Sequence, residues 1–203
     1  VPLQIGTKIV HPSETVRNLG VIFDSQMSMS PQITSLCSGV TFHLRNITRI
    51  RRFLDKDTCH HIVRSLVLSR LDYGNALLLG SSTSDKLKLQ RLQNWASKLI
   101  HCANKYDHAT PFLKQLHWLP VQQRIQYKTL CFIYKCLNDL GPAYLKSCLV
   151  LYTPGRVGLR SSNDTTRLVE HKINHRSLAS AAEKSFSFAS PKLWNSPPIS
   201  ALC

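Results

Sequence analysis

SPQITSLCSGVTFHLRNITRIRRFL, which runs from Ser30 to Leu54, is the stretch of sequence that decides the fold. Apolar side chains recur in it every three or four residues, at Ile33, Leu36, Val40, Leu44, Ile47, Ile50 and Leu54. This spacing puts them in one stripe, so the stretch predicts a long amphipathic helix with one buried face. Ser30 and Pro31 are typical of an N-cap and a first helical turn, which predicts that the helix begins there.

Further helices are predicted downstream of this one. Capping or first-turn residues indicate their starts at Asp55, at Ser81 to Asp85, at Thr110–Pro111 and at Pro120. The apolar faces of the first two consist of Cys59, Ile62, Val63, Leu66 and Val67, and of Leu89, Leu92, Ala96, Leu99 and Ile100. The helix from Pro120 is predicted to end at Leu140–Gly141–Pro142, because glycine and proline stop a helix.

The two ends of the chain differ from this helical middle. Gln4 to Val10 and Asn18 to Phe23 are apolar and rich in Ile and Val, and HPSE lies between them, which predicts a β-hairpin. After Leu151 the sequence is rich in Gly, Ser, Thr and Pro, with a helix candidate near Leu178 to Phe186 and then a proline-broken end. The predicted fold class is mainly α: a short N-terminal β-hairpin (1–24), helical segments (25–106 and 107–150) and an irregular, loop-rich C-terminal arm (151–203).

The charge of the chain favours polyanionic partners. The formal net charge is +15, from 26 lysine and arginine residues against 11 aspartate and glutamate residues. Such an excess attracts nucleic acid by Coulomb interaction and counterion release, although a membrane surface or an acidic protein could satisfy the same charge.

A row of arginines in the long helix is the candidate binding site. No acidic residue occurs from Ser25 to Leu54, whereas the second half of this stretch holds Arg45, Arg49, Arg51 and Arg52. Arg45, Arg49 and Arg52 are spaced by four and three residues, so they share one helix face and suit a run of phosphates. A merely solvated face is the alternative. The aromatic residues Trp95, Trp118, Trp194, Tyr127 and Tyr134 could stack on bases, but their helical spacing is more typical of core positions.

Residues for catalysis or metal binding are not indicated. A polymerase needs clustered carboxylates for two metal ions, but the sequence has no Asp–Asp pair. Asp55 and Asp57 lie at a predicted helix start, and Asp24 follows a strand as a turn or cap residue would. Asp72 precedes Tyr73 rather than following it, so it does not form a catalytic Y-x-D-D motif. The sequence has no C-x-x-C, no H-E-x-x-H and no phosphate-binding glycine loop, so no metal and no cofactor is predicted for this chain.

Cysteine usage and hydropathy indicate the compartment. The seven cysteines form an odd count without framework-like spacing, which favours reduced thiols in the cytoplasm or nucleus over a secreted disulfide scaffold. No run of about 18 apolar residues is present, so no membrane span is expected.

A series of blocks, in this order, closely resembles the region downstream of the polymerase core in non-LTR (LINE-type) retrotransposon reverse transcriptases, such as the chicken-repeat-1 and jockey-like groups. The blocks are SRLDYGNALLLG (Ser69 to Gly80), LQRLQNWASKLI (Leu89 to Ile100), HATPFLKQLHWLPVQQRIQYK (His108 to Lys128), GPAYL (Gly141 to Leu145), GLRSS (Gly158 to Ser162) and FSFASPKLWNSPP (Phe186 to Pro198). Gly74 stands where cysteine is usual, and W-N-S-P-P stands where W-N-x-L-P is typical.

The resemblance implies a nucleic-acid-gripping fragment of an RNA-directed DNA polymerase. In that family the catalytic carboxylates lie upstream, so the chain is expected to start after them and to be inactive alone, with Mg²⁺ expected only in a full-length parent enzyme. VRNLGVIFD (Val16 to Asp24) resembles the hairpin that closes the palm, and 25–106 resembles the thumb. The implied partners are the RNA and DNA backbones of the template–primer and the missing upstream palm and fingers. The alternative is a domesticated basic helical module that binds nucleic acid or protein.

Overall fold

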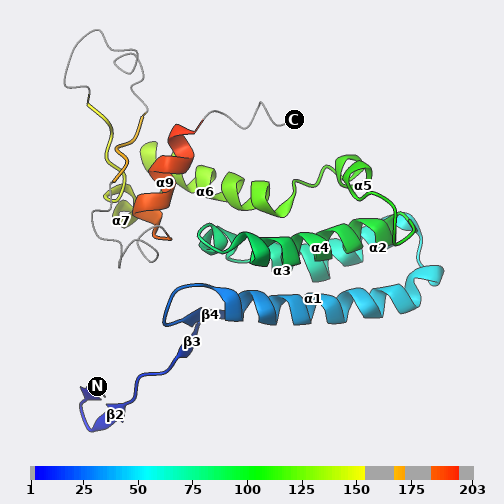
Figure 1. Cartoon of the computed structure of the whole chain (residues 1–203), viewed down its shortest axis with the longest axis horizontal. Coiled ribbons are helices and arrows are strands. Elements are labelled where there is room, and N and C mark those ends of the chain that lie inside the picture. The colour runs from blue at the N-terminus through cyan, green and yellow to red at the C-terminus, as the bar shows by residue number, and fades with distance from the viewer. Residues whose placement is uncertain (1–2, 154–166, 172–183, 197–203) are drawn as a thin grey trace. The chain divides into compact units, whose positions relative to one another are not determined.

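The computed structural model describes residues 3–153, 167–171 and 184–196, and helices predominate in them (Figure 1). The prediction that the chain is mainly α is confirmed. The chain divides into two compact units, the first formed by Val1–Gly74 with Ser81–Val121 and the second by Asn75–Gly80 with Gln122–Cys203. The sequence suggested four segments of different extent.

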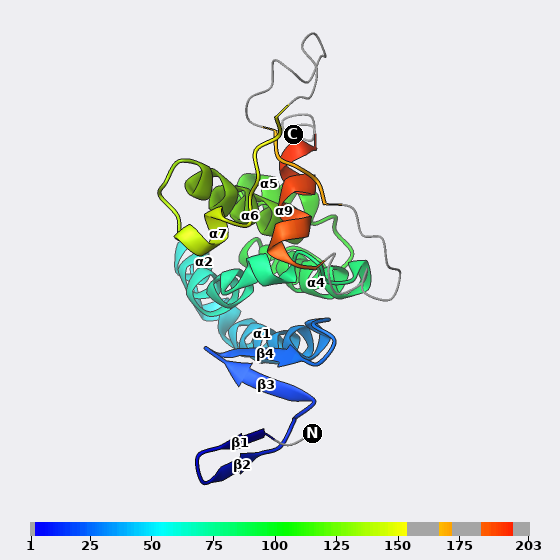
Figure 2. The ribbon, with the colours of Figure 1, turned by 90° about the vertical axis from the view of Figure 1, so that its left-hand side faces the viewer.

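The N-terminus of the first unit forms two hairpins instead of the one predicted (Figure 2). Strand β1 (Leu3–Ile5) pairs with β2 (Lys8–Val10), and β3 (Thr15–Asn18) pairs with β4 (Val21–Asp24), each pair antiparallel. The prediction that Gln4–Val10 pairs with Asn18–Phe23 around HPSE is therefore wrong.

Tight two-residue loops explain why each predicted strand region folds back on itself. The pair Asn18↔Val21 closes β3–β4 around Leu19 and Gly20, whose φ values of 46° and 83° are both positive. Positive φ at both central positions is the geometry that matches the twist of a two-residue hairpin. Gly6, with φ of 60°, begins the corresponding loop between β1 and β2.

Helix α1 (Ser30–Ile50) begins as predicted at Ser30, but Ser30 is not its cap. The N-cap position is Met29, and Asp24 holds the turn before it: the Asp24 carboxylate accepts hydrogen bonds from the backbone N–H groups of Ser28 (3.0 Å) and Met29 (2.8 Å). Burial by itself raises the pKa of Asp24, but these hydrogen bonds together outweigh it and hold the pKa below its ordinary value. The hydroxyl of Ser30 donates elsewhere, to Asp85. The carboxylate after β4 thus has a structural role at the start of α1.

After α1, the first unit contains six further helical elements in chain order. They are the 3₁₀ turn η1 (Arg51–Phe53), α2 (Lys56–Val63), the π-helical segment η2 (Arg64–Leu68), α3 (Ser69–Asp72), α4 (Thr83–Ile100) and α5 (Thr110–Gln115). The predicted starts at Asp55, Ser81 to Asp85 and Thr110 are confirmed, with Asp55 and Ser82 as N-caps.

The apolar stripe of α1 is buried over most of its length. Ile33, Val40, Leu44 and Ile47 are fully buried, whereas Ile50 is 46% exposed because it lies where α1 ends. In the helix predicted to start at Asp55, Leu66 is expected to face the core, but its side chain is exposed. The π-helical turn has more residues per turn than an α-helix, so it shifts the register and puts Val67, Leu68 and Leu71 inside.

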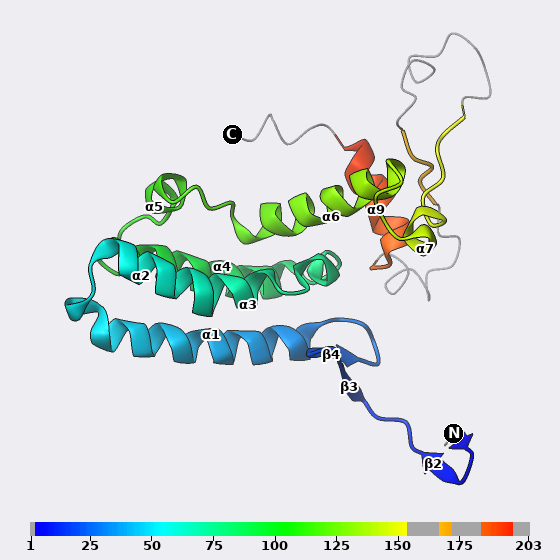
Figure 3. The same cartoon turned by 180° about the vertical axis from the view of Figure 1, so that it is seen from behind.

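Helices α1 and α4 run parallel and are tied together at both ends (Figure 3). At their N-terminal ends, the Ser30 hydroxyl donates to the buried Asp85 carboxylate at 2.9 Å. At their C-terminal ends, the Arg51 guanidinium donates to the backbone oxygens of Leu99 (2.8 Å) and Ile100 (2.9 Å). Arg51 also donates to Leu54 O at 2.6 Å, so one side chain joins the end of α1, the end of α4 and the approach to α2.

The second unit has its own small core. Its elements are the 3₁₀ turn η3 (Asn75–Leu78), α6 (Val121–Leu137), α7 (Ala143–Lys146), α9 (Phe186–Asn195) and an isolated antiparallel bridge between Leu151 and Leu168. The core residues are Ile133, Cys136, Leu149 and Leu168, with Leu130, Leu137, Leu145, Phe186 and Trp194 packed against them.

Helix α6 ends earlier than predicted, at Leu137 rather than at Leu140. Asp139 has a positive φ of 59°, and the Leu140 N–H donates to Lys135 O at 2.8 Å, which closes the helix end. Gly141 then passes so close to α6 that a Cβ there would lie 2.8 Å from the Cys136 sulfur. A glycine is therefore required for the chain to turn back along the helix.

The C-terminal arm contains an unexpected helix. The candidate near Leu178 to Phe186 lies largely outside the described residues, and the stretch expected to be broken by proline forms α9 instead, with Pro191 inside it. Proline usually interrupts a helix because it lacks the amide N–H. Burial of Ser190 and Pro191, with Phe186 and Trp194 packed on the core, overrides that local preference.

We predict that Arg51→Ala lowers the free energy of unfolding by about 2 to 4 kcal/mol, because three charge-assisted hydrogen bonds to backbone oxygens are lost. Urea unfolding followed by helical circular dichroism measures this. Arg49→Ala is the matched control, since Arg49 is exposed and its removal should change stability by less than about 0.5 kcal/mol. Equal effects of the two substitutions would contradict the role given to Arg51.

We predict that Asp85→Asn destabilises the protein by about 1 to 2 kcal/mol at pH 7 and that this difference shrinks as the pH falls below about 3.9. The hydrogen bond from Lys88 is the largest cause that lowers the pKa of Asp85, and with those from Ser30 and Ser82 it outweighs the raising effect of burial. A lowered folded-state pKa stabilises the fold above the unfolded value of about 3.9, and this stabilisation is lost as the pH falls through the folded value. Unfolding of both proteins between pH 7 and pH 3 tests this, and a constant difference would contradict it.

Candidate nucleic-acid interface

The four arginines predicted to contact phosphate lie around the C-terminal end of α1, but they are not equivalent. Arg45 and Arg49 lie on α1 and Arg52 on η1, and all three side chains are exposed. Their spacing of four and three residues puts them in one row, which we call the basic row. Within the described residues, no acidic side chain forms an ion pair with Arg45 or Arg49. The basic row therefore presents unneutralised positive charge to solvent.

Arg52 has a further contact at the end of the row. Its guanidinium lies over the ring of Phe53, 4.6 Å from the ring centroid, and Phe53 is itself 73% exposed. A guanidinium that stacks on an aromatic face keeps its N–H donors in the plane available for a phosphate.

Arg51 is separated from the row by its hydrogen bonds. All three of its guanidinium nitrogens donate to backbone oxygens, so its fork is occupied by the protein itself. The fourth arginine named from the sequence thus supports the fold, and the binding role stays a prediction for Arg45, Arg49 and Arg52.

A groove beside the basic row contains residues that sequence reasoning did not select. It has a volume of about 760 Å³ and is lined by Thr48 of α1, by Arg91, Asn94, Trp95, Lys98 and Leu99 of α4, and by Ala103 and Lys105 after α4. We call it the α1–α4 groove. Arg91, Asn94, Trp95 and Lys98 follow the helical spacing of three and four residues, a signal present in the sequence but overshadowed there by the apolar stripe of α4.

The aromatic residues divide between core and surface. Trp118 is 8% exposed, with its ring centroid 5.9 Å from that of His60, and Trp194 packs on the core of the second unit, as predicted. Trp95 is only half-buried and lines the α1–α4 groove. Tyr127 and Tyr134 are 58% and 57% exposed, so the prediction that they belong to the core is wrong: they lie on the outer side of α6.

Burial next to Trp118 affects His60. It lowers the pKa of the imidazole, and the neighbouring His61 and Arg64 lower it further. A neutral imidazole against the indole adds nothing to the positive surface, so His60 is assigned to packing.

Three aspartates of the first unit have structural roles. Asp24, Asp55 and Asp85 each accept hydrogen bonds at the start of a helix. No group of three or more His, Cys, Asp or Glu residues is placed to hold a metal ion in the described part of the chain. The cysteines in that part, from Cys37 to Cys148, are free thiols.

Within the residues that the structure describes, no helix combines the length and apolar character needed to cross a membrane.

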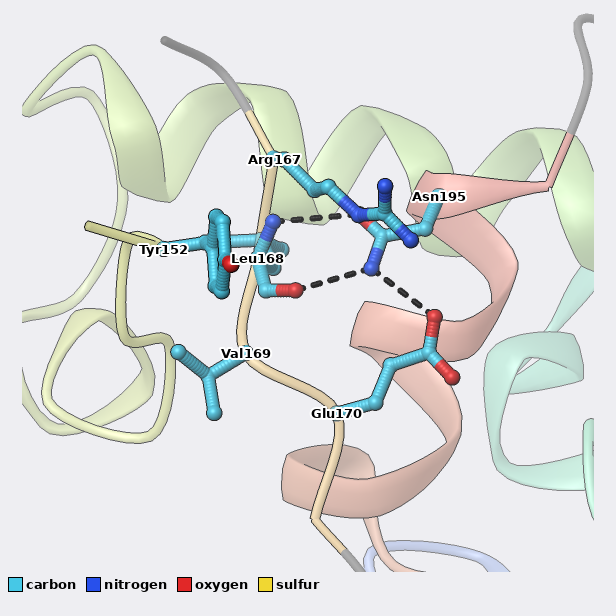
Figure 4. A pocket seen from close by; sticks show the side chains of 6 residues that line it. All are labelled: Tyr152, Arg167, Leu168, Val169, Glu170 and Asn195. Carbon is cyan, nitrogen blue, oxygen red and sulfur yellow. Dashed lines mark hydrogen bonds between the residues drawn. The ribbon is translucent and has the colours of Figure 1, made fainter. Parts of the chain in front are cut away.

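A smaller pocket in the second unit is lined by residues that hydrogen-bond to one another (Figure 4). Its volume is about 270 Å³ and its lining is Tyr152, Arg167, Leu168, Val169, Glu170 and Asn195. The Asn195 side-chain oxygen accepts from Leu168 N at 3.0 Å, and its amide nitrogen donates to Leu168 O (2.8 Å) and Glu170 Oε1 (2.9 Å). The Asn195 amide thus pairs with the Leu168 backbone as a neighbouring strand would. Together with Trp194, which packs on the core, it docks α9 in the second unit.

We predict that Asn195→Leu lowers the stability of the second unit by about 2 to 3 kcal/mol, because the backbone groups of the buried Leu168 lose their side-chain partners. Hydrogen exchange of the Leu168 amide should accelerate. Lys192→Ala, at an exposed position of the same helix, is the control and should leave that amide protected. Unchanged protection in Asn195→Leu would contradict the docking role.

Comparison with known proteins assigns the chain to no family. No protein-family model matches it, and neither does any solved structure. An alignment over 134 residues, which covers 63% of the chain, shows 31% identity to dynein heavy chain-like protein 1 of Plasmodium falciparum (isolate 3D7). The chain spans about 3% of the length of that protein.

Proposed function

We propose that the chain binds the sugar–phosphate backbone of nucleic acid through the basic row, as the non-catalytic, thumb-like region of a non-LTR retrotransposon reverse transcriptase. The observation that supports this best is the exposure of Arg45, Arg49 and Arg52 on one face, without acidic partners among the described residues. The order of sequence blocks that resemble this family supports the second half of the proposal.

The geometry of the row suits a phosphate backbone. Arg45 and Arg52 are seven residues apart, which corresponds to about 10 Å along a helix axis. One strand of a duplex carries about three phosphates over that axial length. Guanidinium groups bind phosphate with two parallel hydrogen bonds each, so three arginines suffice for about three phosphates over that length.

The remaining charge adds an attraction that depends little on sequence. With +15 for the whole chain, release of counterions from the polyanion provides a driving force without base contacts. Binding of this kind holds a template–primer in place and leaves base selection and catalysis to other parts of the enzyme. The proposed partners are accordingly an RNA–DNA duplex and the upstream palm and fingers, in the nucleus or cytoplasm.

The reading frame upstream of Val1 separates this proposal from a domesticated binding module. An open frame that encodes paired aspartates would support the polymerase fragment. A start codon near Val1 without such a frame would overturn that part of the proposal and leave a host-retained basic module.

We predict that replacing Arg45, Arg49 and Arg52 together by Gln weakens binding to an RNA–DNA hybrid and reduces its salt dependence. Each lost phosphate contact lowers the slope of log K against log salt by about 0.9 on a duplex, so the triple variant should lose about 2 to 3. Fluorescence anisotropy with a labelled hybrid, across a series of NaCl concentrations, measures both quantities.

A matched control removes the same charge elsewhere. Arg17, Arg64 and Arg70 are exposed arginines of the same unit outside the basic row, and their triple replacement by Gln should change the slope much less. Equal losses for the two triple variants would show that total charge, and not the basic row, controls binding. Absence of hybrid binding by the unaltered chain at low salt would overturn the proposed function.

A further inference from the structure

The α1–α4 groove has the size and lining of a ligand site. Its volume of about 760 Å³ lies within the range of pockets that take small molecules or single nucleotides. Its lining comes from α1, from α4 and from the segment after α4, all of which belong to the first unit, so the shape of the groove does not depend on the second unit. The ties of Arg51 and Ser30 described above hold the two helices on either side of it.

Among the residues that the structure describes, the charged side chains that line the groove are all positive. Arg91, Lys98 and Lys105 contribute cations and Asn94 an amide, while the Thr48 hydroxyl already donates to Leu44 O at 2.7 Å. The Lys98 ammonium donates to Lys105 O at 2.7 Å, which holds this cation at the groove and fixes the segment that follows α4. Such a lining attracts an anion and offers it several hydrogen-bond donors.

A flat aromatic surface lies among these cations. Trp95 is half-buried, and Leu99 and Ala103 extend the apolar surface beside it. A partly exposed indole next to cations is the arrangement on which single-stranded nucleic-acid binders stack a base while the backbone follows a positive groove. Acidic peptides would use the cations but would leave the indole without a matching partner.

The basic row lies next to Thr48, the residue that α1 contributes to the groove. Thr48, which lines the groove, lies three residues after Arg45 and four before Arg52, so both arginines are its neighbours on the helix surface. A strand whose phosphates lie on the basic row could therefore turn one base into the groove without leaving the row.

We propose that the α1–α4 groove binds one nucleotide of a single strand, with its base stacked on Trp95 and its phosphate held by Arg91, Lys98 and Lys105. This inference rests on the proposed function, since the flanking phosphates lie on the basic row. It adds a preference for unpaired, base-bearing strands to the backbone binding of that row.

The test compares two single-stranded oligonucleotides with equal numbers of phosphates, one with bases and one abasic. Fluorescence anisotropy should show that the full chain binds the base-bearing strand about tenfold more tightly. Trp95→Ala should remove this difference and leave abasic binding unchanged, and Trp95→Phe should retain part of it. Tyr127→Ala, at an exposed aromatic residue of the second unit, should preserve the full difference.

A second measurement covers the case in which Trp95→Ala does not fold. Addition of the base-bearing strand should quench indole fluorescence of the unaltered chain, and Trp95→Phe should abolish most of that quenching. The abasic strand should not quench.

The failure of this inference is distinguishable from failure of the proposed function. If both strands bind equally and the basic-row variant weakens both, the groove inference is overturned and backbone binding stands. If neither strand nor hybrid binds, the proposed function is overturned as well. A poly-glutamate peptide that displaces the base-bearing strand at equal charge concentration would also overturn the groove inference, in favour of an acidic protein partner.

Discussion

The guanidinium of Arg51 is the interaction on which the arrangement of the first unit depends. It donates to backbone oxygens at the end of α4 and at Leu54, where a helix leaves part of its hydrogen-bonding capacity unused. With Asp85 and Ser30 at the opposite end, it sets the spacing of α1 and α4. The α1–α4 groove is a consequence of that spacing, because its lining comes from α1, from α4 and from the segment after α4.

Neighbouring arginines at one helix end therefore have different roles, one in binding the protein's own backbone and the others at the surface. Arg49 and Arg52 are exposed, whereas Arg51, between them in sequence, points to the backbone of α4. Residues adjacent in sequence differ by about 100° around a helix, so a run of arginines necessarily distributes its side chains over different faces. A lysine would not replace Arg51 equivalently, since three carbonyls in this arrangement require the planar fork of donors.

Local patterns in the sequence predicted the long helices, and tertiary contacts account for most of the errors. The stripe from Ile33 to Ile47, the cap at Asp55 and the helix start within Ser81 to Asp85 are short-range features, and they were predicted correctly. The π-helical register of Leu66 and the helix through Pro191 depend on packing that no local window contains. The groove was missed for the same reason: Thr48 and Trp95 are brought together only by the pairing of α1 with α4.

The parallel course of α1 and α4 also has an electrostatic consequence. Parallel helices place both positive dipole ends together and both negative ends together, an arrangement that repels at each end. The Asp85 carboxylate lies at the paired N-termini and the Arg51 guanidinium at the paired C-termini, so each charge opposes the local excess of the macrodipoles. Without Arg51, the exposed carbonyl ends beside Arg52 would present a negative field to an approaching phosphate. The same side chain that fastens the helices thus makes their C-terminal end compatible with a polyanion.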